Sequence, residues 1–355
     1  MQCQCIQHFG QPLIQDERPD MTPTGTEVIL EVTAAGVCHT DLHMREGGVD
    51  LGRGERLNYA DRGIKLPLTV GHETVGRVIA AGPDAGEIDM TRNYVVFPWC
   101  GCGACDVCRQ GDENLCATPR YLGIHVDGGY ATQLRIAHPR YLFDIGDLDP
   151  ARAAPLACSG LTTFSALKKL GDSYFDQPPL LIGAGGLGLM CIRLLAALGA
   201  KAPVVADIDP AKRAAALEAG AAAVIDPASP DVLSEIASAC GGTPPRAILD
   251  FVGAEATAKL AFNALARNGK LVTVGLFGGA APWSLPMITL KSVHIMGSYV
   301  GSLTEFAELI EIARSGAIDA IPSTVFPLDK AEETLNLLEE GKIVGRAVLS
   351  PATQV

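Results

Sequence analysis

Charged and aromatic side chains are scarce in this chain of 355 residues, at 19% and 5% of its composition. Its 28 Lys and Arg are outnumbered by 40 Asp and Glu, and no basic run is present that would neutralise a phosphate backbone. We therefore expect no nucleic-acid partner. The hydrophobic fraction of 48% excludes disorder and fibrous repeats, and the length predicts two domains.

Targeting and membrane signals are also missing from the sequence. The first residues lack the basic start, apolar stretch and small-residue cleavage site of a secretory signal, so we expect a cytoplasmic protein. One uncharged run, Leu271–Leu290, is long enough to span a bilayer. Its glycines and prolines, among them Gly279 and Pro282, break any helix there, and we predict a strand followed by a loop. No membrane partner is expected.

Cysteine is abundant, with 11 residues, an odd count without an export signal. This pattern favours metal binding over a disulfide framework. One group has the spacing C-x2-C-x2-C-x7-C, and four thiolates at such spacing suit a tetrahedral structural zinc. We expect the extra thiol Cys100 to stay unligated. The predicted ligands are Cys102, Cys105, Cys108 and Cys116.

Hydrophobic patterning divides the chain into two parts. Short β-branched runs at 27–33, 74–80 and 94–97 predict antiparallel strands within the first 150 residues. From about Pro178, short buried runs alternate with Ala- and Leu-rich helical stretches, which is typical of a parallel, doubly wound sheet. After about Gly301 a tail of helices and strands follows, and it can return to the first domain.

A G-x-G-x-x-G pattern follows the first of these buried runs and opens a helix. Gly183 is expected to make the tight turn, Gly185 to let the backbone approach a pyrophosphate, and Gly188 to allow close packing of helix and strand. Asp207 ends the next strand, where a carboxylate accepts both ribose hydroxyls of NAD and repels the 2'-phosphate of NADP. Lys212 is placed to reach the same ribose. The sequence therefore predicts NAD as cofactor.

A second set of metal-ligand residues is dispersed: Cys38, His72 and Cys158. Two thiolates and one imidazole would leave one zinc position open, as a catalytic zinc requires. Spacing alone does not decide this, because a buried cysteine often serves as a small hydrophobe.

The surroundings of His72 carry a family signature. Residues Gly71–Gly76, with Gly82 following, fit G-H-E-x2-G-x5-G-x2-V except at the last position, where Ala85 stands on a predicted strand. With the two cysteine sets and the nucleotide motif, the chain resembles the zinc-dependent alcohol dehydrogenases of the medium-chain dehydrogenase/reductase superfamily over nearly its whole length.

The resemblance implies an α/β fold of two domains. A mainly β, GroES-like catalytic domain is expected to comprise residues 1–158 and 300–355. A Rossmann domain with a doubly wound parallel sheet is expected at residues 159–299, where it would bind NAD.

The resemblance also assigns metal ligands. It makes Cys38, His72 and Cys158 the ligands of a catalytic zinc. It places Glu73 beside the metal and makes Asp41 the carboxylate that orients His72. Together with the four-cysteine group, this implies two zinc ions per chain.

Further residues match the family's catalytic and cofactor contacts. Thr40 corresponds to the hydroxyl that bonds the alcohol oxygen, and His43 to the solvent end of the proton path. Thr162 is expected near the nicotinamide, and Arg346 is expected to contact the pyrophosphate. His39 occupies the position of a basic residue beside the phosphates.

The segment Met44–Pro67 is too rich in glycine and charge to form a core. It is predicted either to shape the substrate pocket through Leu57 and Tyr59 or to be a surface or subunit-contact loop. Trp99 and Tyr299 are predicted either to line the pocket or to pack in the interior.

These residues together predict a reversible, NAD-linked oxidation of a primary or secondary alcohol to an aldehyde or ketone. The alternatives are a zinc-free quinone or enoyl reductase of the same superfamily and a non-catalytic zinc- and nucleotide-binding protein. The family implies a homodimer or homotetramer. The sequence does not reveal which alcohol is oxidised.

Overall fold

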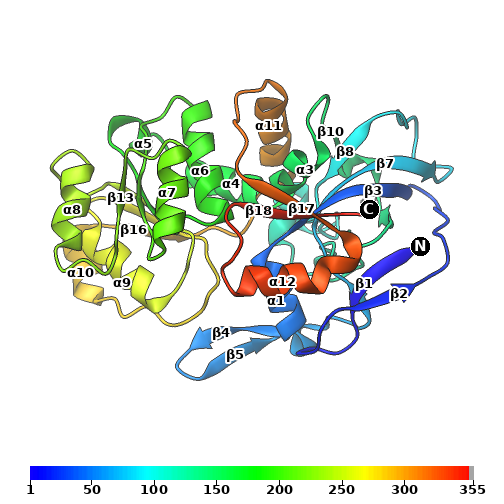
Figure 1. Cartoon of the computed structure of the whole chain (residues 1–355), viewed down its shortest axis with the longest axis horizontal. Coiled ribbons are helices and arrows are strands. Elements are labelled where there is room, and N and C mark those ends of the chain that lie inside the picture. The colour runs from blue at the N-terminus through cyan, green and yellow to red at the C-terminus, as the bar shows by residue number, and fades with distance from the viewer. Residues whose placement is uncertain (352–355) are drawn as a thin grey trace.

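The computed structural model describes residues 1–351, which form two lobes side by side along the longest axis of the molecule (Figure 1). The N-terminus and the last strand lie in the β-rich lobe, and residues from the middle of the chain form the other lobe. Within residues 1–351, no helix has the length and apolar character needed to cross a membrane.

The β-rich lobe is built on one sheet of seven strands and a small sheet of three. Its strands are β1 (Gln2–Ile6), β2 (Ile14–Glu17), β3 (Val28–Val37), β6 (Leu68–Thr69), β7 (Glu73–Ala81), β8 (Asn93–Val96), β9 (Gln133–Ile136), β10 (Leu142–Asp144), β17 (Ser323–Pro327) and β18 (Arg346–Ser350). In the larger sheet the order is β10-β8-β7-β3-β18-β17, and β9 also pairs with β3. The pairs β3–β7, β7–β8 and β3–β18 are antiparallel, so the tail of the chain shares a sheet with β3.

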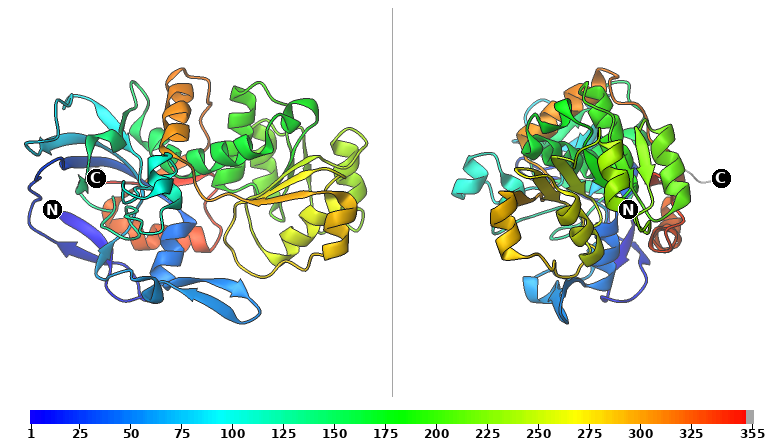
Figure 2. Two further views of the ribbon diagram at one scale, coloured as in Figure 1. Left: turned by 180° about the vertical axis from the view of Figure 1, so that it is seen from behind. Right: turned by 90° about the vertical axis from the view of Figure 1, so that its left-hand side faces the viewer.

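The other lobe contains six parallel strands with helices on both faces (Figure 2). The strands are β11 (Leu180–Ile182), β12 (Val204–Ala206), β13 (Ala223–Ile225), β14 (Ala247–Asp250), β15 (Lys270–Thr273) and β16 (His294–Gly297), and the helices are α5 (Ser173–Asp176), α6 (Gly186–Ala197), α7 (Pro210–Glu218), α8 (Val232–Ala239), α9 (Glu255–Ala264) and α10 (Leu285–Lys291). The order β13-β12-β11-β14-β15-β16 places the first strand centrally. The predicted doubly wound sheet is therefore confirmed.

The remaining helices belong to the β-rich lobe or join the lobes. They are α1 (His39–Glu46), α2 (Asp106–Arg109), α3 (Pro150–Ala153), α4 (Ser159–Leu170), α11 (Leu303–Arg314) and α12 (Ala331–Glu339). Helix α4 is almost wholly buried and contacts both α6 and α11. An ion pair of 2.9 Å between Arg45 and Glu332 joins the last turn of α1 to α12.

The structure corrects two local predictions. The run Leu271–Leu290 does not end as a loop, because helix α10 begins at Leu285 with Pro286 in its first turn, where proline needs no hydrogen-bonded N–H. Strand β7 ends at Ala81, so Ala85 lies in the following turn and not on a strand.

The segment Met44–Pro67 contains the end of α1, a β-hairpin and a short 3-10 turn. Its strands are β4 (Gly48–Gly52) and β5 (Glu55–Asn58). The hairpin extends beneath the other lobe in Figure 1 and touches the loop after β15. A methyl group on Gly278 would lie 2.7 Å from the carbonyl oxygen of Asp50, so the backbones of the two lobes approach closely here.

Candidate active site

Three separate segments bring two thiols and an imidazole together at the junction of the lobes. Cys38 directly precedes α1, His72 directly precedes β7, and Cys158 directly precedes α4. The antiparallel register pairs Gly36 with Glu73, so the ends of β3 and β7 hold Cys38 and His72 side by side. All three are buried, and with Glu73 they offer four ligand atoms within 4.8 Å of one another.

The donor set fits a zinc ion. The Sγ atoms of Cys38 and Cys158 are 4.0 Å apart, close to the ~3.8 Å that a Zn–S bond of ~2.3 Å requires at a tetrahedral ion. Nε2 of His72 is buried and has no hydrogen-bond partner. The Cys158 thiol beside it lowers the pKa of Cys38 well below its ordinary value, which favours a thiolate there. Buried, unpaired donors of this kind are what a metal would satisfy.

Asp41 connects the segments that carry these donors. Its carboxylate accepts hydrogen bonds from the Cys38 amide at 3.0 Å, the Gly71 amide at 3.3 Å and the Tyr130 hydroxyl at 2.9 Å. Its Oδ1 also lies 3.3 Å from Nδ1 of His72. One buried carboxylate therefore fixes the backbone before both Cys38 and His72, and it faces the nitrogen of His72 that would not bind the metal.

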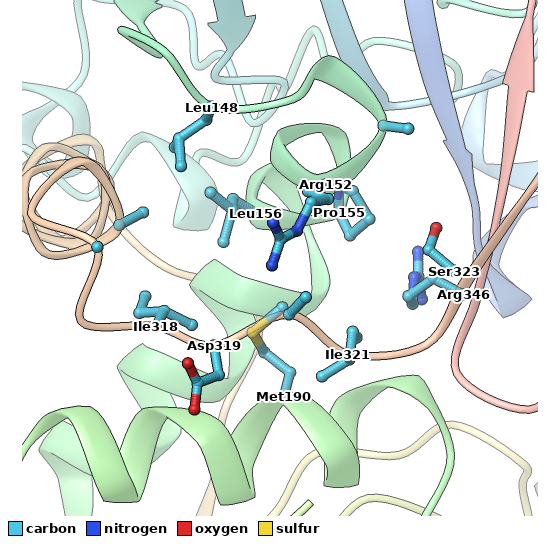
Figure 3. Close-up of a pocket in the computed structure, with 14 residues that line it drawn as sticks. Leu148, Arg152, Pro155, Leu156, Met190, Ile318, Asp319, Ile321, Ser323 and Arg346 are labelled. Atoms are coloured by element: carbon cyan, nitrogen blue, oxygen red, sulfur yellow. The ribbon is translucent and has the colours of Figure 1, made fainter.

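Glu73 and Arg346 form a buried ion pair next to this cluster. The side chain of Arg346 also lies against Gly186 of the glycine-rich segment. Burial raises the pKa of Glu73, and the guanidinium opposes this shift. Figure 3 shows Arg346 at the edge of a small cavity of about 200 Å³, which Met190 and Arg152 also line. The predicted pyrophosphate residue is thus paired with Glu73 and borders the glycine-rich loop.

A larger cavity of about 630 Å³ joins the cysteine–histidine cluster to the other lobe. Thr40 and His43 line it from α1, and Thr162 lines it from α4 with a buried hydroxyl that has no partner. His39 contacts the Phe277 ring across it, with ring centroids 5.2 Å apart. Burial lowers the pKa values of His39 and His43, which favours neutral imidazoles at pH 7.

The glycine-rich segment has the geometry that a dinucleotide site needs. Gly183 adopts φ of 97°, and a methyl group on Gly188 would strike the Gly183 carbonyl. The space beside Gly185 is open. The carboxylate of Asp207 accepts hydrogen bonds from the Ala184 amide at 2.7 Å and the Asp209 amide at 2.9 Å, which fixes it beside the loop. Each of its oxygens retains a lone pair for a ribose hydroxyl.

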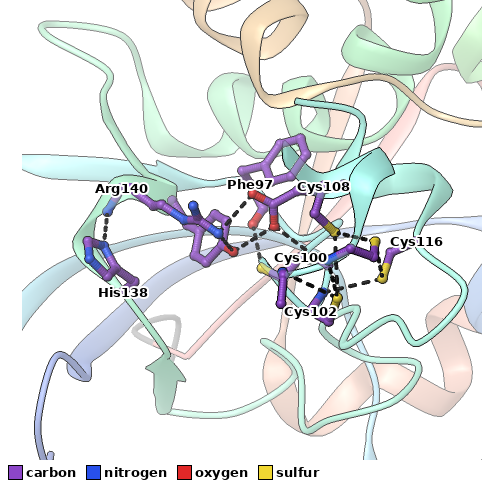
Figure 4. A network of polar contacts seen from close by, with 12 residues as sticks. Phe97, Cys100, Cys102, Cys108, Cys116, His138 and Arg140 are labelled. Atoms are coloured by element: carbon purple, nitrogen blue, oxygen red, sulfur yellow. Dashed lines mark hydrogen bonds and ion pairs between the residues drawn. The ribbon is translucent and has the colours of Figure 1, made fainter. Parts of the chain in front are cut away.

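The four-cysteine group forms a compact cluster in the β-rich lobe (Figure 4). Its Sγ–Sγ distances are 3.4 Å for Cys105–Cys108, and 3.9 Å for both Cys102–Cys108 and Cys105–Cys116. Amides of Ala104 and Cys105 lower the pKa of Cys102 to about 6. The spacing and the stabilised thiolate fit a tetrahedral zinc.

Cys100 lies outside this cluster. Its thiol donates to the Phe97 carbonyl at 3.5 Å, and burial raises its pKa to about 12. A thiol of this kind stays protonated near neutral pH, and so it is a poor metal ligand.

Two protein families match the chain in the order of its lobes. The Alcohol dehydrogenase GroES-like domain matches residues 24–147, and the Zinc-binding dehydrogenase family matches residues 186–315. An NAD-dependent alcohol dehydrogenase of Sulfurisphaera tokodaii is 36% identical over 351 residues, which cover 99% of this chain and 100% of that protein. The chain belongs to the zinc-type alcohol dehydrogenase family.

Solved structures of this family have the same architecture. The alcohol dehydrogenase of Aeropyrum pernix aligns with a TM-score of 0.88 at 29% identity and covers 99% of this chain and 100% of its own. Acetophenone reductase of Geotrichum candidum, solved in complex with NAD, aligns with a TM-score of 0.85 at 26% identity over 100% of this chain and 98% of its own. The predicted GroES-like and Rossmann architecture of an alcohol dehydrogenase is thus confirmed.

Some residues of this alcohol dehydrogenase site carry no motif, and the sequence did not single them out. Tyr130 bonds Asp41 from a distant turn, and Phe277 covers His39 from the loop after β15. Lys212 lies on α7, and after burial its charge is one of the smaller contributions that lower the pKa of His39. The large cavity is lined by Leu57, Tyr59, Trp99 and Tyr299. Trp99 is only 1% exposed, so it also packs in the interior.

Proposed function

We propose that this member of the alcohol dehydrogenase family oxidises primary or secondary alcohols to aldehydes or ketones with NAD, and catalyses the reverse reaction. One observation carries the proposal: a single cavity is lined by Cys38 and Cys158 at one side and by Leu187 of the glycine-rich motif at the other. Substrate and cofactor would meet in that cavity, at the carboxyl ends of the parallel strands.

Cys38, His72 and Cys158 would hold a catalytic zinc, and Asp41 would orient His72. When bound, zinc supplies a Lewis acid that polarises the substrate oxygen. Thr40 would accept the hydroxyl proton, and His43 would pass it toward solvent, since both line the cavity on one helix.

The residues at and around the glycine-rich loop also support NAD as the cofactor. Asp207 would accept the adenosine ribose hydroxyls, with Lys212 nearby, and Gly183, Gly185 and Gly188 would admit the pyrophosphate at the start of α6. Arg346 and His39 would contact the phosphates, and Thr162 would lie near the nicotinamide.

A second zinc, bound by Cys102, Cys105, Cys108 and Cys116, would be structural, which gives two per chain. The four thiols form a cluster of their own, and the catalytic cluster has a separate set of ligands.

Self-association is also proposed, as a homodimer or homotetramer. Helix α10 exposes Leu285 at 76% and Leu290 at 63%, next to the edge strand β16. An exposed strand edge beside an apolar helix face is a favourable place for a second copy to pair. Light scattering would test this, and a Leu290→Glu variant that stays as large as the wild type would contradict this choice of interface.

The activity is tested by following NADH formation with primary and secondary aliphatic and benzylic alcohols. Dialysis against a chelator should abolish the rate, and added Zn²⁺ should restore it. An unchanged rate from protein shown to contain no metal would support a zinc-free reductase. Full binding of NAD and zinc with no turnover of any alcohol would support the non-catalytic alternative.

A further inference from the structure

Three aromatic rings form one wall of the large cavity: Trp99, Tyr121 and Tyr299. Their centroids are 5.5 Å apart for Trp99–Tyr121, 6.0 Å for Trp99–Tyr299 and 6.3 Å for Tyr121–Tyr299. Trp99 also lies 5.3 Å from the His72 ring, so the wall begins at the proposed catalytic metal.

Hydrogen bonds fix this wall in place. The Trp99 indole donates to the Ala157 carbonyl at 3.0 Å, and the Tyr121 hydroxyl donates to the Asn114 carbonyl at 2.6 Å. The Asn114 amide donates to the Tyr299 carbonyl at 3.0 Å. Since the polar atoms of Trp99 and Tyr121 are already bonded, the small part of these buried rings that borders the cavity is apolar, and Tyr299, which is 43% exposed, presents most of the ring surface. Such a surface suits a flat, aromatic group, which gains from edge or offset ring contacts.

The end of the wall away from the metal is polar. The His125 ring packs edge-on against Tyr121, with centroids 5.1 Å apart. Its Nδ1 is buried and has no hydrogen-bond partner. Arg62, at the end of the turn after the hairpin, lines the same cavity and is exposed to solvent. Its side chain forms no ion pair or hydrogen bond within residues 1–351.

The charged residues that line the cavity, among those the structure describes, are of positive sign only. Among the residues that the structure describes, no Asp or Glu lines it, although the whole chain has a net charge of -12. Arg62 is the only arginine or lysine in the lining of this part of the chain. His125 and Arg62 line the same cavity, and burial and the charge of Arg62 both lower the pKa of His125. An unpaired guanidinium and an unpaired imidazole nitrogen in the lining of one cavity can both bind a carboxylate.

We propose that the preferred substrates are aryl alcohols, with their aldehydes or ketones, that carry a carboxylate remote from the carbinol carbon. The aryl group would lie against Trp99, Tyr121 and Tyr299. Arg62 would bind the carboxylate, and His125 would donate a second hydrogen bond to it. This inference rests on the proposed function and names the substrate class of the same site.

The test compares matched pairs of benzylic alcohols in steady-state kinetics with NAD. Each pair has the same length and differs in one group: 4-(hydroxymethyl)benzoate against its primary amide, and 3-[4-(hydroxymethyl)phenyl]propanoate against its primary amide. A charge-assisted contact should raise kcat/KM for the carboxylate of at least one pair by about tenfold to a hundredfold. The gain should appear chiefly in KM, because the contact is remote from the reacting carbon.

Variants show whether Arg62 is responsible. Arg62→Gln should bring the carboxylate-to-amide ratio of kcat/KM close to one, and His125→Phe should lower it less. Arg92→Gln is the matched control, because it removes the same charge from an exposed turn outside the cavity and should leave the ratio unchanged.

The test distinguishes a failure of this inference from a failure of the proposed function. If amides and unsubstituted benzyl alcohol are oxidised as well as both carboxylates, the inference is wrong and the proposed function stands. A carboxylate preference that survives in Arg62→Gln would also overturn the inference. If no alcohol is oxidised, the proposed function itself fails.

Discussion

Arg346 and Glu73 form a buried ion pair between the last strand of the chain and the residue directly after His72. The same arginine lies against Gly186, so one side chain borders both the cysteine–histidine cluster and the glycine-rich loop. The C-terminal strand β18 is thereby part of the site, because its pairing with β3 carries Arg346 to this position.

Replacement of either Arg346 or Glu73 alone should lower the free energy of unfolding. Arg346→Gln would leave the Glu73 carboxylate buried without its cation, and we expect the free energy of unfolding to fall by about 3–5 kcal/mol in chemical denaturation. The double variant Arg346→Gln with Glu73→Gln should recover part of this loss. Arg77→Gln, which breaks an exposed pair with Glu31, should change stability by about 1 kcal/mol or less. Equal effects of the two arginine variants would contradict the importance of the buried pair.

The sequence predicted what depends on local pattern. The buried runs at Leu180–Ile182 and Val204–Ala206 predicted parallel strands, which the structure contains. The cysteine spacing from Cys102 to Cys116 predicted a cluster of four thiols, and the structure contains that cluster too. Their periodicity and spacing reflect short-range geometry, which one sequence is enough to reveal.

Patterns of this kind could not predict contacts between residues that are far apart in the sequence. Tyr130 reaches Asp41 only because the strands place distant turns together, and only the fold brings Arg62 and His125 into the lining of one cavity. Helix α10 was missed because its prolines and the preceding glycines read as loop, although Pro286 sits in a first turn that tolerates it.

Loss of the proposed catalytic zinc and loss of the proposed structural zinc should have different effects. Cys158→Ala should leave one zinc, a folded chain and NAD binding, but no turnover, because only the catalytic cluster changes. Cys105→Ser should also leave one zinc, and it should lower the thermal midpoint or solubility. Elemental analysis, calorimetry and NADH formation check these outcomes.

Cys100→Ser is the control for the cysteine variants. It changes a buried thiol beside the four-cysteine cluster and should retain both metals. One zinc in the folded, active wild type would rule out the two-site interpretation.

Cofactor choice should depend on Asp207. Asp207→Ser would remove a carboxylate that is fixed by two amides, and with it the ribose contacts and the repulsion of a 2'-phosphate. We expect KM for NAD to rise and the NADP-to-NAD ratio of kcat/KM to increase. Asp231→Ser, in an exposed position before α8, removes an equal charge and should leave the ratio unchanged. Equal use of both cofactors by the wild type would show that Asp207 does not select NAD.

Thr40 and His43 provide the sharpest test of the proposed proton path. Both lie on α1 and line the cavity that Cys38 borders, and Thr40 is the nearer in sequence to that cysteine. Thr40→Val keeps the shape of the side chain but removes the hydroxyl that would accept the alcohol proton. We expect turnover to fall by ~100-fold or more, the range of general acid–base catalysis. Thr40→Ser retains the hydroxyl and should stay much more active than Thr40→Val.

His43 would act at the outer end of the path, where water can replace it. Burial lowers its pKa below the ordinary value of 6.5, so its imidazole is neutral and able to accept a proton at pH 7. His43→Ala should therefore cost less than Thr40→Val, lose most at low pH, where hydroxide is scarce, and recover in part when buffer bases are added. His8→Ala, at an exposed position, is the control. A deuterated alcohol shows whether hydride transfer limits the rate. If it does, and Thr40→Val still turns over within a factor of ~2 of the wild type, the path through Thr40 is excluded.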